Sequence, residues 1–185
     1  MNLLLIVSFI WFISEVSLAL LKRSSTGSKN LDRSSLRILW ITIFIGINTG
    51  VFLAISGIGR LNFYARETYF IGLIFILLGL LVRWIAIFQL RKYFTVNVSI
   101  REDHQLIQKG LYRYLRHPSY SGSLLSFFGL ALAFNNWITF LIIFFPILFA
   151  FLYRISVEEA ELRKSFGDNY LAYAQRTKKI IPGVY

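Results

Sequence analysis

Residues 121–155, SGSLLSFFGLALAFNNWITFLIIFFPILFAFLYRI, decide the fold because Arg154 is the one charged residue in the run. About 20 apolar residues are enough for a helix to cross a hydrocarbon core of about 30 Å, so the run is too long for one span. Asn135-Asn136 lies near its middle, where asparagine is costly in hydrocarbon but common in turns. We therefore predict a helical hairpin, with helices over residues 118–134 and 137–155.

Three more apolar runs precede the hairpin. Residues 3–21 are interrupted by three serines and Glu15, and Lys22-Arg23 follow at once. A signal peptide would carry its basic residues on the other side, so we expect a retained anchor. Residues 36–58 and residues 70–90, the latter broken only by Arg83, read as two further spans. The sequence thus predicts an all-α, polytopic membrane protein, one domain over residues 1–185 with about five transmembrane helices.

Composition narrows the function classes. The chain is 56% hydrophobic and carries a formal charge of +11. Nucleic acid, anionic lipid headgroups and control of membrane topology each account for a basic chain, and the apolar runs between the charges argue against nucleic acid. Without cysteine, the chain has no disulfide, thiolate metal site or cysteine nucleophile. We predict no metal site.

The basic residues also predict the orientation. Residues 22–37 hold five Lys and Arg, residues 91–116 six and the tail after Tyr153 six, against two in residues 59–69. Basic loops stay in the cytoplasm, so we place the N-terminus outside and the C-terminus inside, which needs an odd number of spans. Five spans satisfy this, with cytoplasmic segments over residues 91–117 and 156–185. Function is expected there, because the long polar segments are there.

Two polar segments stand out. Pro118 favours the first position of a helix, which puts His117 at or beside the N-cap and its free backbone N–H groups. Either a carboxylate or an adenine edge binds there, or Arg-His-Pro only marks a helix start. Arg154 and Glu158 share a helix face, as an ordinary i,i+4 pair or as a clamp for an acceptor carboxylate and a cofactor.

The tail is expected to be plainer. Glu159 and Glu161 read as a solvated face. Gly167-Asp168 predicts a helix stop followed by a new start, and hence two short helices in the tail. The Ser- and Lys-rich stretch over residues 24–35 reads as a flexible loop.

Two ionisable residues lie inside predicted spans. Glu15 and Arg83 are each six or seven residues from the predicted cytoplasmic ends of their spans, and so at similar depth. Either they pair with each other, or Arg83 extends to the membrane surface.

The motifs together form one pattern. It runs from His104-x-Leu106-Ile107-x-x-Gly110-x-Tyr112 to Arg116-His117-Pro118-x-Tyr120. After the hairpin it continues through Arg154-x-x-x-Glu158-Glu159 and Phe166-Gly167-x-x-Tyr170-x-x-Tyr173 to Ile181-Pro182. In order, spacing and position at span ends, this pattern resembles the isoprenylcysteine carboxyl methyltransferase family, which is related to phospholipid methyltransferases. The resemblance covers about half of the chain.

The resemblance implies a membrane methyltransferase that uses S-adenosylmethionine and acts on a lipid-like or prenylated acceptor at the cytoplasmic surface. By the same resemblance, Arg154 would face the methyl acceptor. The cofactor would contact ten residues: His104, Gln105, Leu106, Ile107, Tyr112, His117, Pro118, Ser119, Tyr120 and Glu158.

Other functions stay open. A lipid-amine methyltransferase on the same scaffold would need a base, for which His104 or Glu158 is the candidate. A membrane reductase would use NADPH, and a non-catalytic membrane protein or small transporter would use neither cofactor. The sequence does not identify the acceptor, the host membrane or the oligomeric state.

Overall fold

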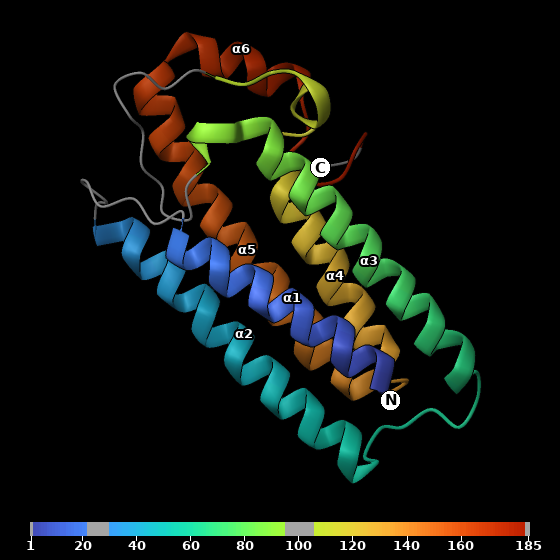
Figure 1. The fold of residues 1–185 in the computed structure, drawn as a ribbon. Helices are drawn as coiled ribbons and strands as arrows, with labels where there is room; N and C mark the ends of the chain where they lie inside the picture. Colours follow the sequence, from blue (N-terminus) through green and yellow to red (C-terminus); the bar gives the residue numbers. More distant parts are fainter. Residues whose placement is uncertain (1, 22–29, 95–105, 184–185) are drawn as a thin grey trace.

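The computed structural model describes residues 2–21, 30–94 and 106–183, and within them the chain is helical, with two isolated bridges and no strand. The long helices form an elongated bundle with α6 at one end (Figure 1). They are α1 (Asn2–Leu21), α2 (Asn30–Ser56), α3 (Ala65–Leu90), α4 (Pro118–Ala133), α5 (Trp137–Phe166) and α6 (Asp168–Arg176). Two short 3₁₀ turns cover Arg91–Tyr93 and Gly110–Arg113.

Four helices, α1, α2, α3 and α5, are long and apolar enough to cross a membrane. α4 has 16 residues, which at 1.5 Å each span about 24 Å, less than a hydrocarbon core of about 30 Å. The all-α, multi-pass class is confirmed, whereas the count of five spans and their orientation stay predictions.

The asparagine turn forms as predicted. Asn135 adopts a left-handed conformation with φ 48°, and the Asn136 side chain caps α5 by accepting from the Thr139 N–H at 3.0 Å. The same residues also do something the sequence does not indicate. The Asn135 amide donates to Leu61 O at 2.8 Å, and the Asn136 amide donates to Ile58 O at 2.8 Å. The α4–α5 turn therefore holds the α2–α3 connection, and this end of the bundle is closed by buried amides.

Small residues set the packing of α3 on α4. A Cβ added to Gly72 would lie 2.5 Å from Gly129 O, and one added to Gly122 would lie 2.5 Å from Arg83 N. Such close backbone contact is the usual way in which helices associate in lipid, where apolar surface gives no driving force of its own. α3 and α4 thus pack as one closely associated pair. α2 packs on α5 instead, and the Gly50 carbonyl of α2 accepts a hydrogen bond from Thr139 Oγ1 of α5 at 3.1 Å.

Two expectations for the segments predicted to be cytoplasmic are wrong in detail. α5 does not end near residue 155 but continues to Phe166, 30 residues in all, so the tail holds the end of this helix and α6 rather than two short helices. The break at Gly167 is confirmed, with φ 50°. Residues 30–35 of the expected loop belong to α2, and Ser35 is fully buried.

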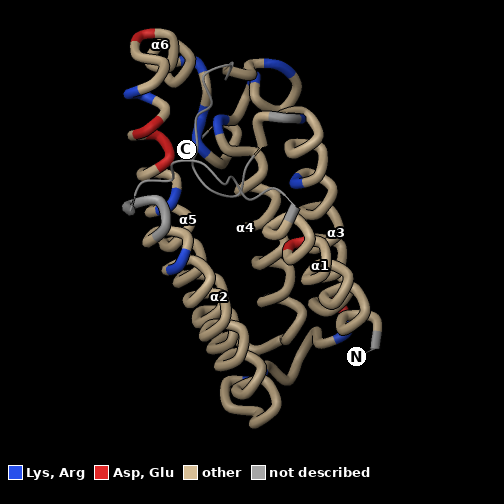
Figure 2. Tube along the Cα trace, turned by 60° about the vertical axis from the view of Figure 1, so that its left-hand side comes forward, with Lys and Arg blue, Asp and Glu red and all other residues tan. Residues whose placement is uncertain are grey.

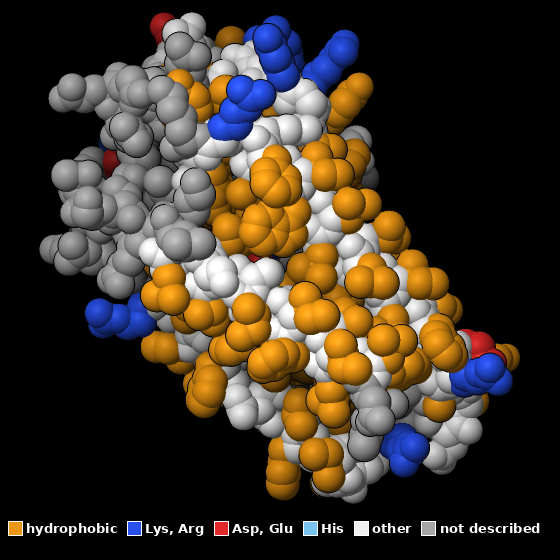
Figure 3. Space-filling model, in the orientation of Figure 1, with side chains coloured by type: hydrophobic (Ala, Val, Ile, Leu, Met, Phe, Trp, Pro, Cys, Tyr) orange, Lys and Arg blue, Asp and Glu red, His pale blue; other side chains and the backbone are white. Residues whose placement is uncertain are grey.

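Charge and hydrophobicity divide the surface. Lys and Arg gather towards the α6 end of the molecule (Figure 2), while hydrophobic side chains cover much of the helical middle of the face in Figure 3. Leu5, Phe9, Phe44 and Phe52 are each more than 60% exposed, as suits contact with lipid tails. Where the charged end meets the apolar bundle, the side chains of the predicted site converge.

Candidate functional site

The polar end is built by the C-terminal segment lying parallel to the residues before α4. Arg116 N–H donates to Lys178 O at 2.7 Å, His117 N–H to Lys179 O at 3.0 Å, and Lys178 N–H to Tyr114 O at 3.1 Å. These bonds position His117 as the N-cap of α4, as predicted, with Pro118 opening the helix. These backbone bonds fix the start of α4 relative to the C-terminal segment.

Glu159 is central here, contrary to the expectation of a solvated face. It is 4% exposed, and its Oε1 accepts from Arg116 Nε at 2.8 Å. Lys179 Nζ lies 3.8 Å from its Oε2. Arg116 also donates to the backbone carbonyls of Ala174 and Thr177, so this one guanidinium joins α5 to α6 and the C-terminal segment. Glu161, in contrast, contacts the exposed Lys164 Nζ at 3.2 Å.

His117 and Tyr120 form the next layer. Their rings stack at a centroid distance of 5.7 Å and an interplanar angle of 14°. His117 Nε2 lies 3.4 Å from Glu159 Oε1, and His117 Nδ1 lies 3.9 Å from Glu158 Oε1. Tyr120 Oη donates to Glu158 Oε2 at 2.8 Å. The imidazole therefore lies between two carboxylates, one buried and one whose side chain is 27% exposed.

Arg154 completes this end from within α5. It is 1% exposed, and its Nη1 donates to Ser35 Oγ of α2 at 2.7 Å. A buried guanidinium keeps its charge and presents several N–H donors in one plane, which suits bidentate binding of a carboxylate or phosphate. Ser35 was missed because a serine in a Ser-rich stretch carries no sequence signal for this contact.

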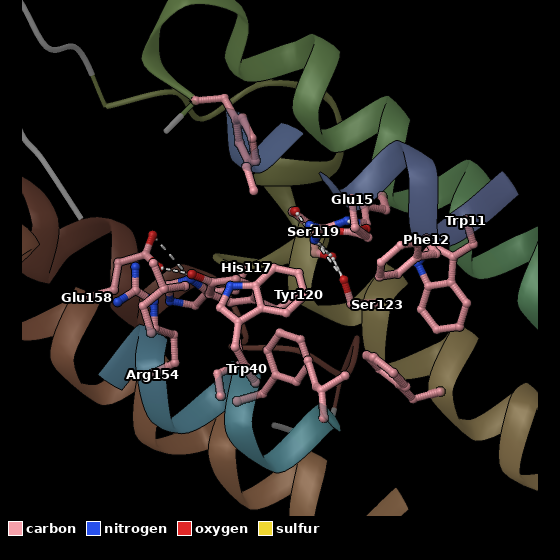
Figure 4. A pocket seen from close by; sticks show the side chains of 18 of the residues that line it. Trp11, Phe12, Glu15, Trp40, His117, Ser119, Tyr120, Ser123, Arg154 and Glu158 are labelled. Atoms are coloured by element: carbon pink, nitrogen blue, oxygen red, sulfur yellow. Dashed lines mark hydrogen bonds and ion pairs between the residues drawn. The ribbon is translucent and has the colours of Figure 1, made fainter. Parts of the chain in front are cut away.

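A cavity of about 780 Å³ connects these groups to the apolar part of the bundle. Its walls come from α1, α2, α4, α5, the end of α3 and the residues around Tyr112. In Figure 4, Arg154 and Glu158 lie on one side, His117 and Tyr120 in the middle, and Glu15, Phe12 and Trp11 on the other side. The far apolar end is lined by Leu4, Ile47, Val51 and Ile55, among others.

Most of the predicted site residues meet in this cavity. Eight of them line it: Leu106, Ile107, Tyr112, His117, Ser119, Tyr120, Arg154 and Glu158. Pro118 is buried but does not line the cavity, and His104 and Gln105 lie outside the described residues. Sequence reasoning missed the apolar lining, including Trp11, Trp40 and Phe151, because such residues do not differ in type from others that face lipid or core.

The pairing of Glu15 with Arg83 is confirmed. Arg83 Nη2 lies 2.6 Å and its Nε 2.5 Å from the two Glu15 oxygens. Arg83 Nη1 also donates to Ser119 Oγ at 3.1 Å and to Ser123 Oγ at 2.7 Å. Both charged side chains line the cavity, so the ion pair is part of its wall.

Buried tyrosines frame the polar end from outside the spans. Burial, followed by the nearby Glu158 carboxylate, raises the pKa of Tyr112. Burial, followed by the Glu159 carboxylate, raises the pKa of Tyr170. Tyr173 Oη donates to Tyr112 O at 2.7 Å. These phenols stay neutral at physiological pH and present rings beside the carboxylates.

The fold and the site define an integral membrane protein, multi-pass in architecture, with a ligand cavity that joins a charged end to an apolar end. Comparison with known proteins agrees. Residues 71–164 match the model of the isoprenylcysteine carboxyl methyltransferase family. The chain belongs to this family.

Individual relatives carry the same description. The chain is 37% identical over 115 residues to protein-S-isoprenylcysteine O-methyltransferase B of Arabidopsis thaliana, covering 61% of this chain and 58% of the relative. It is 34% identical over 110 residues to the protein-S-isoprenylcysteine O-methyltransferase of Schizosaccharomyces pombe, covering 58% of this chain and 47% of that relative. A solved structure of a eukaryotic intramembrane Ras methyltransferase, an isoprenylcysteine carboxyl methyltransferase, matches with a TM-score of 0.57 and 26% identity over 86% of this chain and 55% of that one. The chain thus spans about half the length of the relatives it matches.

Proposed function

We propose that this protein is an S-adenosylmethionine-dependent membrane methyltransferase that methylates the carboxylate of a lipid-like, isoprenylcysteine-type acceptor. One observation carries the proposal. A single cavity places Arg154, Glu158, His117 and Tyr120 at its charged end and continues into apolar walls formed by α1 and α2. A polar donor and an acceptor with a long apolar chain fit such a cavity from opposite ends.

The residues at the charged end fit the cofactor. Its sulfonium is positive, and Glu158 together with the rings of Tyr112 and Tyr120 offers a carboxylate and π-faces to a positive charge. When bound, the cofactor supplies an electrophilic methyl group. We assign its binding to Leu106, Ile107, Tyr112, the run 117–120 and Glu158, with His104 and Gln105 proposed from the family pattern.

Arg154 is assigned to the acceptor. Its guanidinium lies in the cavity wall, where a carboxylate arriving from the apolar end meets a fixed charge. A carboxylate is already ionised at neutral pH, so no general base is required. The protein's contribution is then alignment of the two reactants and exclusion of water, which rate comparisons show to be large effects.

Positively charged residues around this end support a cytoplasmic site facing anionic lipid. Most basic residues of the described segments lie towards the α6 end (Figure 2), and basic surfaces are retained on the cytoplasmic side of membranes. We propose that membrane lipid surrounds α1 to α3, and that the cofactor enters from the α6 end.

The test is calorimetric titration of S-adenosylhomocysteine into the protein in lipid nanodiscs, with three variants. His117→Ala and Glu158→Ala are expected to weaken binding at least tenfold, because each removes a group at the charged end. Arg154→Lys is expected to keep this binding and to lower methyl transfer into a farnesyl-cysteine analogue. Lys164→Ala, whose side chain is 64% exposed on the same helix, serves as the control. Absence of binding by folded wild-type protein would refute the proposed function.

A further inference from the structure

A row of aromatic rings leads along the cavity away from the charged end. Ring centroids are 5.4 Å apart between Tyr120 and Phe151, 6.3 Å between Phe151 and Phe127, and 4.7 Å between Phe127 and Trp11. All four residues line the cavity. An apolar chain lying on these rings would run from the reacting end towards the middle of α1.

The row ends at two polar atoms that have no use in the reaction. Trp11 is 6% exposed. Within the described residues, its Nε1–H and the Ser8 hydroxyl are buried without a hydrogen-bond partner. Ser8 and Trp11 are three positions apart on α1, so they share a helix face, and both line the cavity. A buried donor left without an acceptor costs about 1–3 kcal/mol, which is unusual enough to require an explanation.

These atoms differ from the charged and hydroxyl side chains next to them, which contact one another. Glu15, one turn along α1 from Trp11, is paired with Arg83, and Ser119 and Ser123 bond to the same guanidinium. The Trp11 N–H is therefore a donor without a hydrogen-bond partner, beside an ion pair and in a wall that is otherwise apolar towards Leu4 and Ile47.

We propose that Trp11 and Ser8 form a second polar subsite of the acceptor chamber, which binds a hydrogen-bond-accepting oxygen carried partway along the acceptor's chain. The ligand class is a lipid-like acid of the proposed kind that carries, in addition to the reacting carboxylate, an ether, carbonyl or hydroxyl oxygen in its tail. This inference rests on the proposed function, since it assumes that the cavity holds the methyl acceptor.

The ring distances limit where that oxygen lies. Taken end to end, they put the Trp11 ring within about 16 Å of the Tyr120 ring. An extended chain covers about 3.5 Å per three bonds, so the oxygen falls within roughly 14 bonds of the chain atom beside Tyr120.

The test is an oxygen scan measured by binding, without cofactor. A series of long-chain thioether acids, each with one methylene replaced by an ether oxygen, competes with a radiolabelled plain-chain acid on protein in nanodiscs. At most positions the oxygen enters the chamber without a donor, and affinity should fall roughly tenfold. At the one or two positions that reach Trp11, affinity should stay within about threefold of that of the plain chain, because a hydrogen bond replaces the lost hydration.

Variants assign the effect. Trp11→Phe keeps a ring against Phe127 but has no N–H, so the favoured position should lose roughly tenfold relative to the plain acid. Ser8→Ala should reduce the same ratio without changing any ring. Trp84→Phe is the control, because Trp84 packs on Phe88 and does not line the cavity.

The outcomes separate the two proposals. Binding of the plain acid with no favoured oxygen position, or a favoured position unchanged in both Trp11→Phe and Ser8→Ala, overturns the subsite and leaves the methyltransferase standing. Failure of folded protein to bind the plain acid overturns both. A favoured position that disappears in either variant supports the subsite.

Discussion

Removal of the Glu15 carboxylate isolates a charge inside the bundle. In Glu15→Ala, Arg83 keeps its bonds to Ser119 and Ser123 but loses the two contacts of 2.5 and 2.6 Å with Glu15. The Arg83 side chain is only 10% exposed, so solvent does not replace the lost anion. Breaking a buried ion pair by deleting one partner costs about 3–5 kcal/mol. In a chain of this size 1 kcal/mol shifts Tm by roughly 2–4 °C, so we expect a fall of about 6–20 °C.

The assay is thermal unfolding in one detergent, followed by size-exclusion fluorescence, for a double-mutant cycle. Arg83→Leu and Glu15→Ala each leave one charge unpaired, whereas the double variant leaves none. The double variant should therefore be more stable than the sum of the single losses predicts, by at least 1 kcal/mol of coupling. Glu67→Ala, an exposed acid in the first turn of α3, is the control and should change Tm little.

Strict additivity of the two single losses would refute the reasoning that these charges stabilise one another. Exchange of the two residues is a further check. A carboxylate at position 83 would face the Ser119 carbonyl, which now accepts from Arg83 at 3.3 Å. The exchanged pair should therefore recover only part of the lost Tm, and full recovery would mean that the serine contacts contribute nothing.

Two further predictions concern the charged end. Glu159→Gln removes the charge that holds Arg116, so S-adenosylhomocysteine should bind about tenfold more weakly and protease should cleave the C-terminal segment sooner. Glu161→Gln is the control and should behave as the wild-type protein does. Equal behaviour of the two variants would be evidence against the role of Glu159. Burial raises the pKa of Tyr170 and Tyr173 above the ordinary value, so the fold keeps both phenols neutral while the unfolded chain ionises. The stability that the neutral phenols contribute is fully present below pH 10 and should be lost as pH rises above it. Measured as the fall in Tm from its value at pH 8, this loss should be smaller in Tyr173→Phe than in the wild-type protein. A Tm that stays constant up to pH 11 would contradict the prediction.

The sequence predicts the parts of the fold that follow from local pattern. Apolar length identifies the helices, the two asparagines identify the hairpin turn, and Pro118 identifies where α4 begins, because each reflects a local cost in lipid or in backbone geometry. The end of α5 is not local in this sense. No residue between Ile155 and Gly167 stops a helix, and most polar residues there are helix formers. The end of the apolar run therefore did not predict the end of the helix.

The site shows the same division. Motif residues such as His117, Tyr120 and Glu158 were recognisable as a set, and they do meet. Glu159 was not, because a glutamate beside another glutamate looks solvated unless the position of Arg116 is known. The pairing of Glu15 with Arg83 could be anticipated only because two charges at similar depth in lipid have few other partners.

Arg154 and Glu158 show why spacing alone did not determine their roles. Four positions apart on α5, they suggest a simple helix-surface pair. In the structure Arg154 donates to Ser35 of α2, while Glu158 accepts from Tyr120 of α4. Arg154 is thus bonded to α2 and Glu158 to α4, so the charged end draws on α2, α4 and α5 together. A site assembled in this way couples cofactor binding to the packing of the bundle, so S-adenosylhomocysteine should raise Tm of the wild-type protein and raise it less in Tyr120→Phe, where Glu158 loses the hydroxyl that holds it.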